Sequence, residues 1–182
     1  MVTSRALNSP AVQTLLSEAS LAGSWVLDPS RSAVELHTRH TWGLRPLDGV
    51  FRQVSGHGAV SSAGEVSGTI EVAATSIDTK NAMRDRDLRS ARFFDVGTYP
   101  HIVFTLEKLT TSSDAVIASG TLTVRDRTRP LAFPVQVSTP GDELVLDAEV
   151  HIDRGEFGLT FHFFGMASLQ NTIVVHAVLI RR

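Results

Sequence analysis

The chain has 182 residues, of which 42% are hydrophobic and 20% charged; these values are typical of one globular domain and exclude a disordered chain. Seventeen Lys and Arg residues nearly balance nineteen Asp and Glu residues, so a broad basic surface for binding nucleic acid is not expected. The absence of cysteine excludes disulfides, thiolate nucleophiles and Cys-ligated metals.

No segment predicts a membrane span or an export signal. The longest apolar run, residues 173–180, is interrupted by His176, whereas a spanning helix needs about 18 apolar residues. The residues after Arg5 lack the continuous apolar core of a secretory signal. We therefore expect a cytoplasmic protein without stable membrane insertion.

Residues 1–22 form a predicted helical extension that precedes a β-domain at 23–182. Ser9 and Pro10 suit an N-cap and first helical position, and the helix is predicted to end near Gly23. Its apolar residues recur at helical spacing: Val12, Leu15, Leu16 and Ala19. The pattern favours a helix packed on the body as a lid or buttress. A helix that binds a partner or a membrane surface is the alternative.

From Trp25 onward the apolar residues recur with period two, which predicts about eight half-buried antiparallel strands. Long strands in sequence order with short turns fit an all-β, up-and-down barrel better than a sandwich. A barrel of eight strands is either filled by its own side chains or holds one small ligand. The residues predicted to line its interior, and so to bind an apolar ligand, are Val34, Leu36, His40, Phe51, Ile70, Val72, Ile102, Phe104, Leu122 and Phe133.

Residues 78–100 break the alternation. We predict a short crossover helix at 81–90 that plugs or flanks the barrel, anchored by Phe93 and Phe94. Four arginines and four aspartates alternate in this segment and are expected to pair with one another and tie it to the strand ends: Arg84, Arg86, Arg89 and Arg92 with Asp78, Asp85, Asp87 and Asp95. Orienting the polar head of a ligand is the alternative role.

The sequence predicts no catalytic set, metal site or cofactor. His37 and His40 are three residues apart, so on a regular strand they face opposite sides and cannot share a metal. The other histidines are scattered and are expected on the surface or at the barrel rim. In Gly64-Glu-Val-Ser-Gly68 the serine stands in the fourth place, not the third place of a nucleophile elbow. No phosphate-binding loop is present.

Several ordered motifs between residues 23 and 182 resemble the YceI-like family of lipid-binding proteins. They are Trp25-Val-Leu-Asp28, Ser32-Ala-Val34 with His40, Gly49-Val-Phe51 with Gly56, Ser76-Ile-Asp-Thr79, Arg84-Asp85, Leu88-Arg-Ser90, Phe93-Phe-Asp-Val96, Tyr99-Pro100, Ile102, Phe104, Gly120-Thr-Leu-Thr123, Thr128-Arg-Pro130, and Ile152, Arg154, Phe157 and Gly158. The resemblance implies a lipocalin-like barrel whose hydrophobic channel binds polyisoprenoids, quinones or similar long-chain lipids, and no catalytic residues.

Three departures bear on the ligand: the helical extension, Asp87 where the family often has His, and the aromatic segment 161–165. We expect non-enzymatic binding, sequestration or transport of a long-chain isoprenoid or fatty amphiphile. One alternative is an enzyme acting on a lipid or quinone, with His40 as the inward candidate. The other is a barrel packed solid by the aromatic residues of 161–164, which a cavity below about 300 Å³ would favour. A homodimer is compatible with the sequence.

Overall fold

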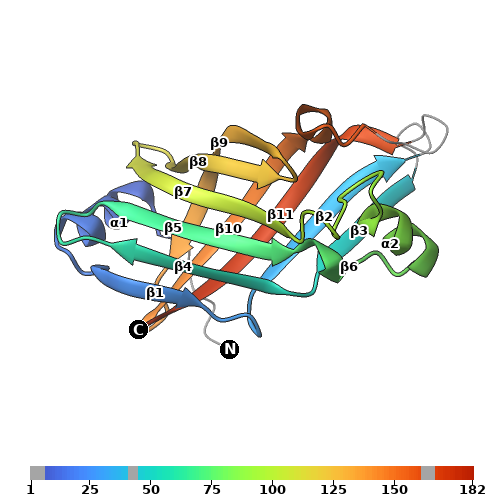
Figure 1. Cartoon of the computed structure of the whole chain (residues 1–182). Helices are drawn as coiled ribbons and strands as arrows, with labels where there is room; N and C mark the ends of the chain where they lie inside the picture. The colour runs from blue at the N-terminus through green and yellow to red at the C-terminus, as the bar shows by residue number, and fades with distance from the viewer. Residues whose placement is uncertain (1–6, 41–44, 161–166) are drawn as a thin grey trace.

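The computed structural model describes residues 7–40, 45–160 and 167–182. It is a closed antiparallel β-barrel of eight staves with two α-helices among the described residues (Figure 1), as predicted. No helix within the described ranges has the length and hydropathy needed to cross a membrane.

In chain order the elements are α1 (Ser9–Ser17), β1 (Gly23–Leu27), β2 (Ala33–His40), β3 (Arg45–Phe51), β4 (Val54–Val60), β5 (Val66–Ala73), the 3-10 turn η1 (Ala74–Ser76), β6 (Ile77–Asp78), α2 (Ala82–Arg89), β7 (His101–Thr111), β8 (Val116–Val124), β9 (Arg127–Ser138), β10 (Glu143–Asp153), the 3-10 turn η2 (Arg154–Phe157) and β11 (Ala167–Arg181).

A stave here is one strand of the barrel, and the eleven described strand segments form eight staves because three staves are interrupted. β1 and β2 form the first stave, and β3 and β4 form the next, since β1 pairs with β4 and β2 pairs with β3. β5 and β6 form the third, since β5 pairs with β4 and β6 pairs with β3. At the first break Asp28 Oδ1 accepts hydrogen bonds from the Ser30 amide at 2.9 Å and hydroxyl at 2.6 Å, which turns the chain before β2. The long strand β11 pairs with both halves of the first stave and closes the barrel.

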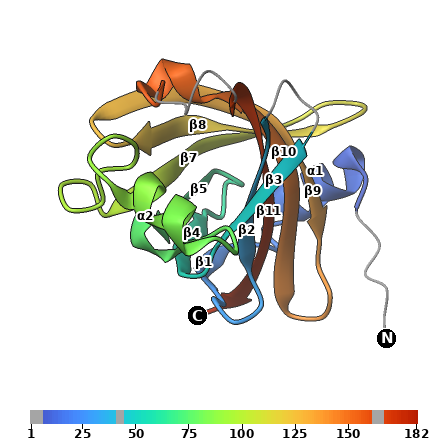
Figure 2. The same ribbon diagram turned by 90° about the vertical axis from the view of Figure 1, so that its right-hand side faces the viewer.

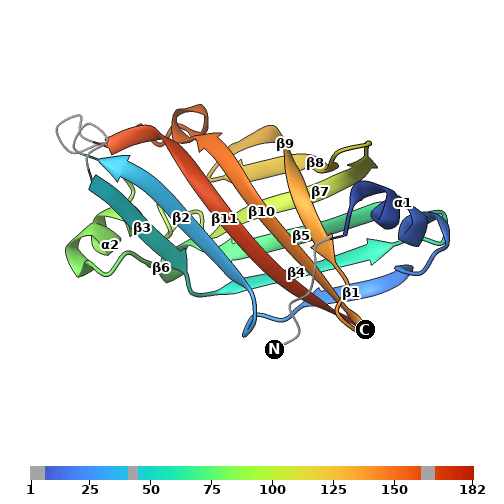
Figure 3. The same cartoon turned by 180° about the vertical axis from the view of Figure 1, so that it is seen from behind.

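Helix α1 closes one end of the barrel (Figure 3). Asn8, rather than the predicted Ser9, is the N-cap, and its side chain accepts a hydrogen bond from the Ala11 amide. Ser9 is instead buried and donates from its hydroxyl to the Ala115 carbonyl at 3.0 Å. The helix ends at Ser17, earlier than predicted, and Ala19 has a left-handed φ of 55°, which a right-handed helix cannot continue. The predicted packing of this helix on the barrel is confirmed.

Helix α2 lies at the opposite end, where the strands form a ring seen end-on in Figure 2. Asn81 caps it by accepting a hydrogen bond from the Arg84 amide at 3.1 Å. After the helix, Phe94 is buried and packs edge-on against Phe51, with 6.1 Å between ring centroids. Both the predicted crossover helix and its aromatic anchor are confirmed.

The hydrogen bonds that hold the α2 segment differ from the predicted arginine–aspartate pairs. Arg84 donates to the Thr79 hydroxyl and carbonyl, and Arg89 donates to the Ile77 carbonyl. Asp78 pairs with Arg52, which lies outside the segment, and with Lys80. The arginines bind carbonyl groups because an irregular loop leaves acceptors that no strand ladder satisfies.

Candidate ligand cavity

The alternate residues of the barrel strands face a common interior. In antiparallel pairs, residues opposite one another share a face, and the register places Phe104 opposite both Ile70 and Leu122. On the next strand Phe133 reaches the same space, with its ring centroid 5.2 Å from that of Phe104. These side chains line a cavity of about 230 Å³ whose wall is almost wholly apolar.

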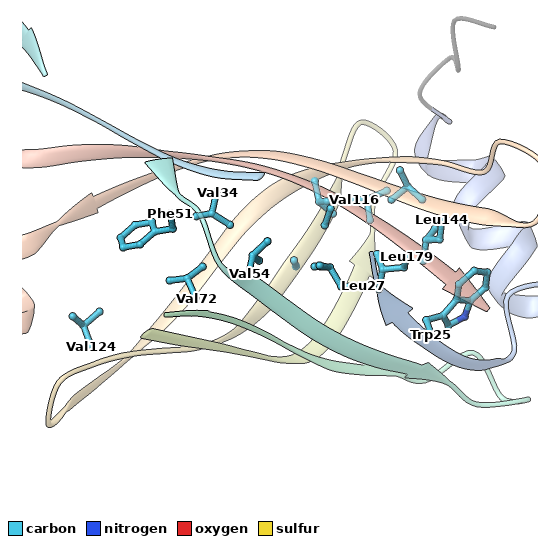
Figure 4. Packing of buried hydrophobic residues seen from close by; sticks show 14 of the residues in the cluster. Trp25, Leu27, Val34, Phe51, Val54, Val72, Val116, Val124, Leu144 and Leu179 are labelled. Carbon is cyan, nitrogen blue, oxygen red and sulfur yellow. The ribbon is translucent and has the colours of Figure 1, made fainter. Parts of the chain in front are cut away.

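Buried residues follow the length of the interior. In Figure 4 they extend from Trp25 and Leu179 beside α1, past Leu27 and Val54, to Phe51. Other wall residues keep intermediate solvent exposure although they point inward: Leu36, Ile70, Ile102, Phe104, Leu106, Leu122, Phe133, Leu146, Ala148, Ile173 and Val175. The interior is therefore not completely filled by its own side chains.

The structure brings nine of the ten predicted site residues together on the cavity wall. They are Val34, Leu36, Phe51, Ile70, Val72, Ile102, Phe104, Leu122 and Phe133. The tenth, His40, ends β2 opposite Arg45, and its side chain lies outside the described residues. The aromatic segment 161–165 also lies outside them. Whether the nine residues bind a ligand stays a prediction.

The prediction omitted the part of the wall that β10 and β11 contribute. Leu144, Leu146, Ala148 and Val150 on β10 face the cavity together with Ile173, Val175 and Leu179 on β11. The signal was present in the sequence, because both segments alternate apolar residues with period two.

One charged side chain is buried in the wall. Arg154, which begins η2, is 5% exposed and lies over the ring of Phe93 with 5.5 Å between its Cζ and the ring centroid. Its Nε donates to the Ser168 carbonyl at 3.0 Å and its Nη1 donates to the Leu159 carbonyl. Burial lowers the pKa of the Arg154 guanidinium from its ordinary value, and the nearby charge of Asp153 acts in the opposite direction.

Four of the described histidines lie outside the cavity and contact carboxylates: His37, His101, His151 and His176. His37 Nδ1 is 2.7 Å from Asp48 Oδ1, and His176 Nδ1 is 2.6 Å from Asp147 Oδ1. These pairs join neighbouring strands across the outer face. Within the described ranges, no group of three His, Asp or Glu side chains is placed to hold a metal ion.

Comparison with known proteins identifies the barrel. The YceI-like domain matches residues 25–179, which is most of the chain. The chain belongs to the YceI-like family. Protein YceI of Salmonella newport is 28% identical over 149 residues, covering 76% of this chain and 74% of that protein.

Two solved structures share this YceI-like fold. The crystal structure of BcnA from Burkholderia cenocepacia has a TM-score of 0.76 at 20% identity and covers 84% of this chain and 98% of its own. A polyisoprenoid binding domain from Saccharophagus degradans has a TM-score of 0.70 at 14% identity and covers 87% and 98%. At these identities the likeness concerns the fold.

Proposed function

We propose that this YceI-like protein is a non-enzymatic binder that sequesters or carries a long-chain isoprenoid or similar amphiphile inside the barrel. The observation that carries the proposal is the apolar cavity, which inward-facing residues of intermediate exposure leave incompletely filled. Each square ångström of apolar tail removed from water contributes about 25 cal/mol. The polyisoprenoid binding domain with the same fold supports an isoprenoid as the ligand class.

The cavity volume favours a second candidate, a barrel without a ligand. About 230 Å³ is less than the roughly 300 Å³ at which ordinary ligand pockets begin. A long chain bound here would place only part of its length in this space. The rest would extend through the barrel wall or displace side chains. The two candidates therefore differ in whether a lipid accompanies the purified protein.

The enzyme alternative requires an inward-facing carboxylate or histidine that titrates near the working pH. The described residues that line the cavity include no Asp or Glu, and their one histidine, His57, is exposed to solvent. His40 is still the residue to substitute if turnover of a lipid or quinone is observed. Cytoplasmic location and a homodimer also stay predictions.

The test is native mass spectrometry of the protein purified from a bacterial host without detergent, followed by organic extraction. We expect an added mass that matches a prenyl chain, a quinone or a fatty amphiphile. Phe104→Asp places a charge on the cavity wall and should abolish this mass while leaving a folded barrel. Thr105→Asp, on the exposed outer face of the same strand, is the matched control and should retain it.

The opposite results also have a clear meaning. A bare protein mass that persists after incubation with prenyl alcohols, quinones and fatty acids would establish the barrel without a ligand. A lipid that accompanies Phe104→Asp as well as the unmodified chain would place the ligand outside the cavity.

A further inference from the structure

The barrel wall is weakly joined between β9 and β10. These strands pair at three positions only, where 136–138 meets 145–147. By contrast, β8 pairs with β9 from Val116 to Val124 without interruption. Pro130 and Pro134 lie in the part of β9 that does not pair with β10, and proline, which has no amide hydrogen, is confined to strand edges. Beyond the three pairs the strands separate (Figure 3), so residues 127–135 of β9 have no partner on β10.

The inner row of β9 changes from apolar to cationic toward the start of the strand. Phe133 and Leu131 line the cavity, and the next residues with the same facing are Arg129 and Arg127. The register confirms their facing, because Arg129 lies opposite Leu122 and Arg127 lies opposite Val124, and both partners are on the cavity wall. We call Arg127 and Arg129 the mouth arginines, and the end of the inner row that they occupy the mouth.

The mouth arginines are positioned without a carboxylate partner. Both residues are exposed, and Arg129 Nη1 donates to the Thr128 carbonyl at 3.2 Å. The Arg127 guanidinium lies against Gly158, where a Cβ would be 3.0 Å from Arg127 Cζ. Among the ion pairs of the described residues, none within 4.0 Å includes either arginine.

A third cation lies on the neighbouring part of the wall. Arg154 follows the last inward residues of β10, and η2 packs against β9. Asp126 is the exposed acid nearest in sequence to Arg127, and Glu156 is the exposed acid nearest in sequence to Arg154. An apolar inner row that ends in guanidinium groups matches an amphiphile with an anionic head group. Guanidinium binds carboxylates and phosphates with paired, charge-assisted hydrogen bonds.

We propose that the bound amphiphile has an anionic head group, a phosphate or a carboxylate, which lies at this mouth against Arg127 and Arg129. The tail then follows the inner rows of β9 and β10 into the cavity. This inference rests on the function proposed above and adds the chemistry and the location of the polar end.

The experiment compares ligands with the same chain and different head groups by isothermal titration calorimetry. Farnesyl diphosphate is compared with farnesol, and palmitate with hexadecanol. We expect each anion to bind at least about tenfold more tightly than its alcohol, which corresponds to one or two charge-assisted hydrogen bonds. Raising the salt concentration should reduce only the affinity for the anions. Preference for the diphosphate or the carboxylate identifies which head group is used.

The double variant Arg127→Gln/Arg129→Gln should remove most of this difference and change the affinity for the alcohols less than about twofold. Lys108→Gln/Arg182→Gln removes the same charge from exposed residues elsewhere and should preserve the difference. Equal binding of anions and alcohols by the unmodified chain would overturn the head-group inference while the proposed function stands.

Two further outcomes separate the proposals. Failure of every amphiphile to bind would overturn both. Inorganic diphosphate that binds as tightly as farnesyl diphosphate would show an anion site independent of the tail, and would overturn the inference that one amphiphile occupies both regions.

Discussion

The indole Nε1 of Trp25 donates a buried hydrogen bond of 2.9 Å to the carbonyl of Leu21, which joins β1 to the segment that follows α1. Trp25 is 2% exposed and lines the cavity. The Arg181 guanidinium lies over its ring, with 4.8 Å from Cζ to the centroid, and donates to the Ala22 and Ser20 carbonyls. One aromatic residue thus connects the α1 end to the seam between β1 and β11.

We expect Trp25→Ala to reduce the free energy of unfolding by about 3–5 kcal/mol, because it leaves a cavity at the closed end of the barrel. Trp25→Phe keeps most of the ring, loses the hydrogen bond to Leu21 and should cost about 1 kcal/mol. Urea unfolding followed by circular dichroism measures both. Equal costs for the two variants would show that the hydrogen bond, and not ring packing, stabilises this end.

Gly120 allows β7 and β8 to approach closely inside the barrel. A Cβ at this position would lie 1.9 Å from the Thr105 carbonyl oxygen, and the register between the strands shifts between Leu106 and Lys108. Gly120→Ala should therefore force the strands apart and cost about 1–3 kcal/mol. Gly97→Ala is the control, because no heavy atom lies within 4 Å of its Cβ position. A variant at Gly120 as stable as that control would show that this seam is flexible.

The alternation of apolar residues predicted the strands and most of the cavity wall because burial in a barrel has the same period as the strand pleat. The predicted N-cap, Ser9, was wrong by one residue. Asn8 is an equally good N-cap type, and Ser9 instead uses its hydroxyl to contact Ala115 on a distant segment. Arginine partners and cavity volume could not be predicted, because they depend on which carbonyls and which gaps remain after distant strands pack together.

The buried side chain of Asp85, in α2, stabilises the turn that precedes the helix by accepting hydrogen bonds from Thr79. It is 7% exposed, and its Oδ1 accepts hydrogen bonds from the Thr79 amide at 2.9 Å and the Thr79 hydroxyl at 2.5 Å. Asp85→Ala leaves both donors without this acceptor and should cost about 1–3 kcal/mol in thermal unfolding. Asp87→Ala, on the exposed side of the same helix, should change stability by less than about 0.5 kcal/mol. A similar cost at both positions would point to helix charge and not to the Thr79 contacts.

Asp78 makes the stability of the α2 end dependent on pH. Hydrogen bonds from Arg52, at 2.8 and 3.1 Å, and from the Lys80 amide hold the pKa of Asp78 well below its ordinary value of 3.8. A carboxyl whose pKa is lower in the folded state contributes stability above its unfolded pKa, and loses it as the pH falls toward the folded pKa. Asp78→Asn should therefore be less stable than the unmodified chain at pH 7, and the difference should shrink below about pH 4.

Urea unfolding at a series of pH values between 7 and 2 measures this difference. The exposed Asp114 serves as the comparison, since Asp114→Asn should show no comparable change across the series. A difference between Asp78→Asn and the unmodified chain that stays constant down to pH 2 would mean that the shape of the Asp78 side chain, and not its charge, ties β6 to Arg52.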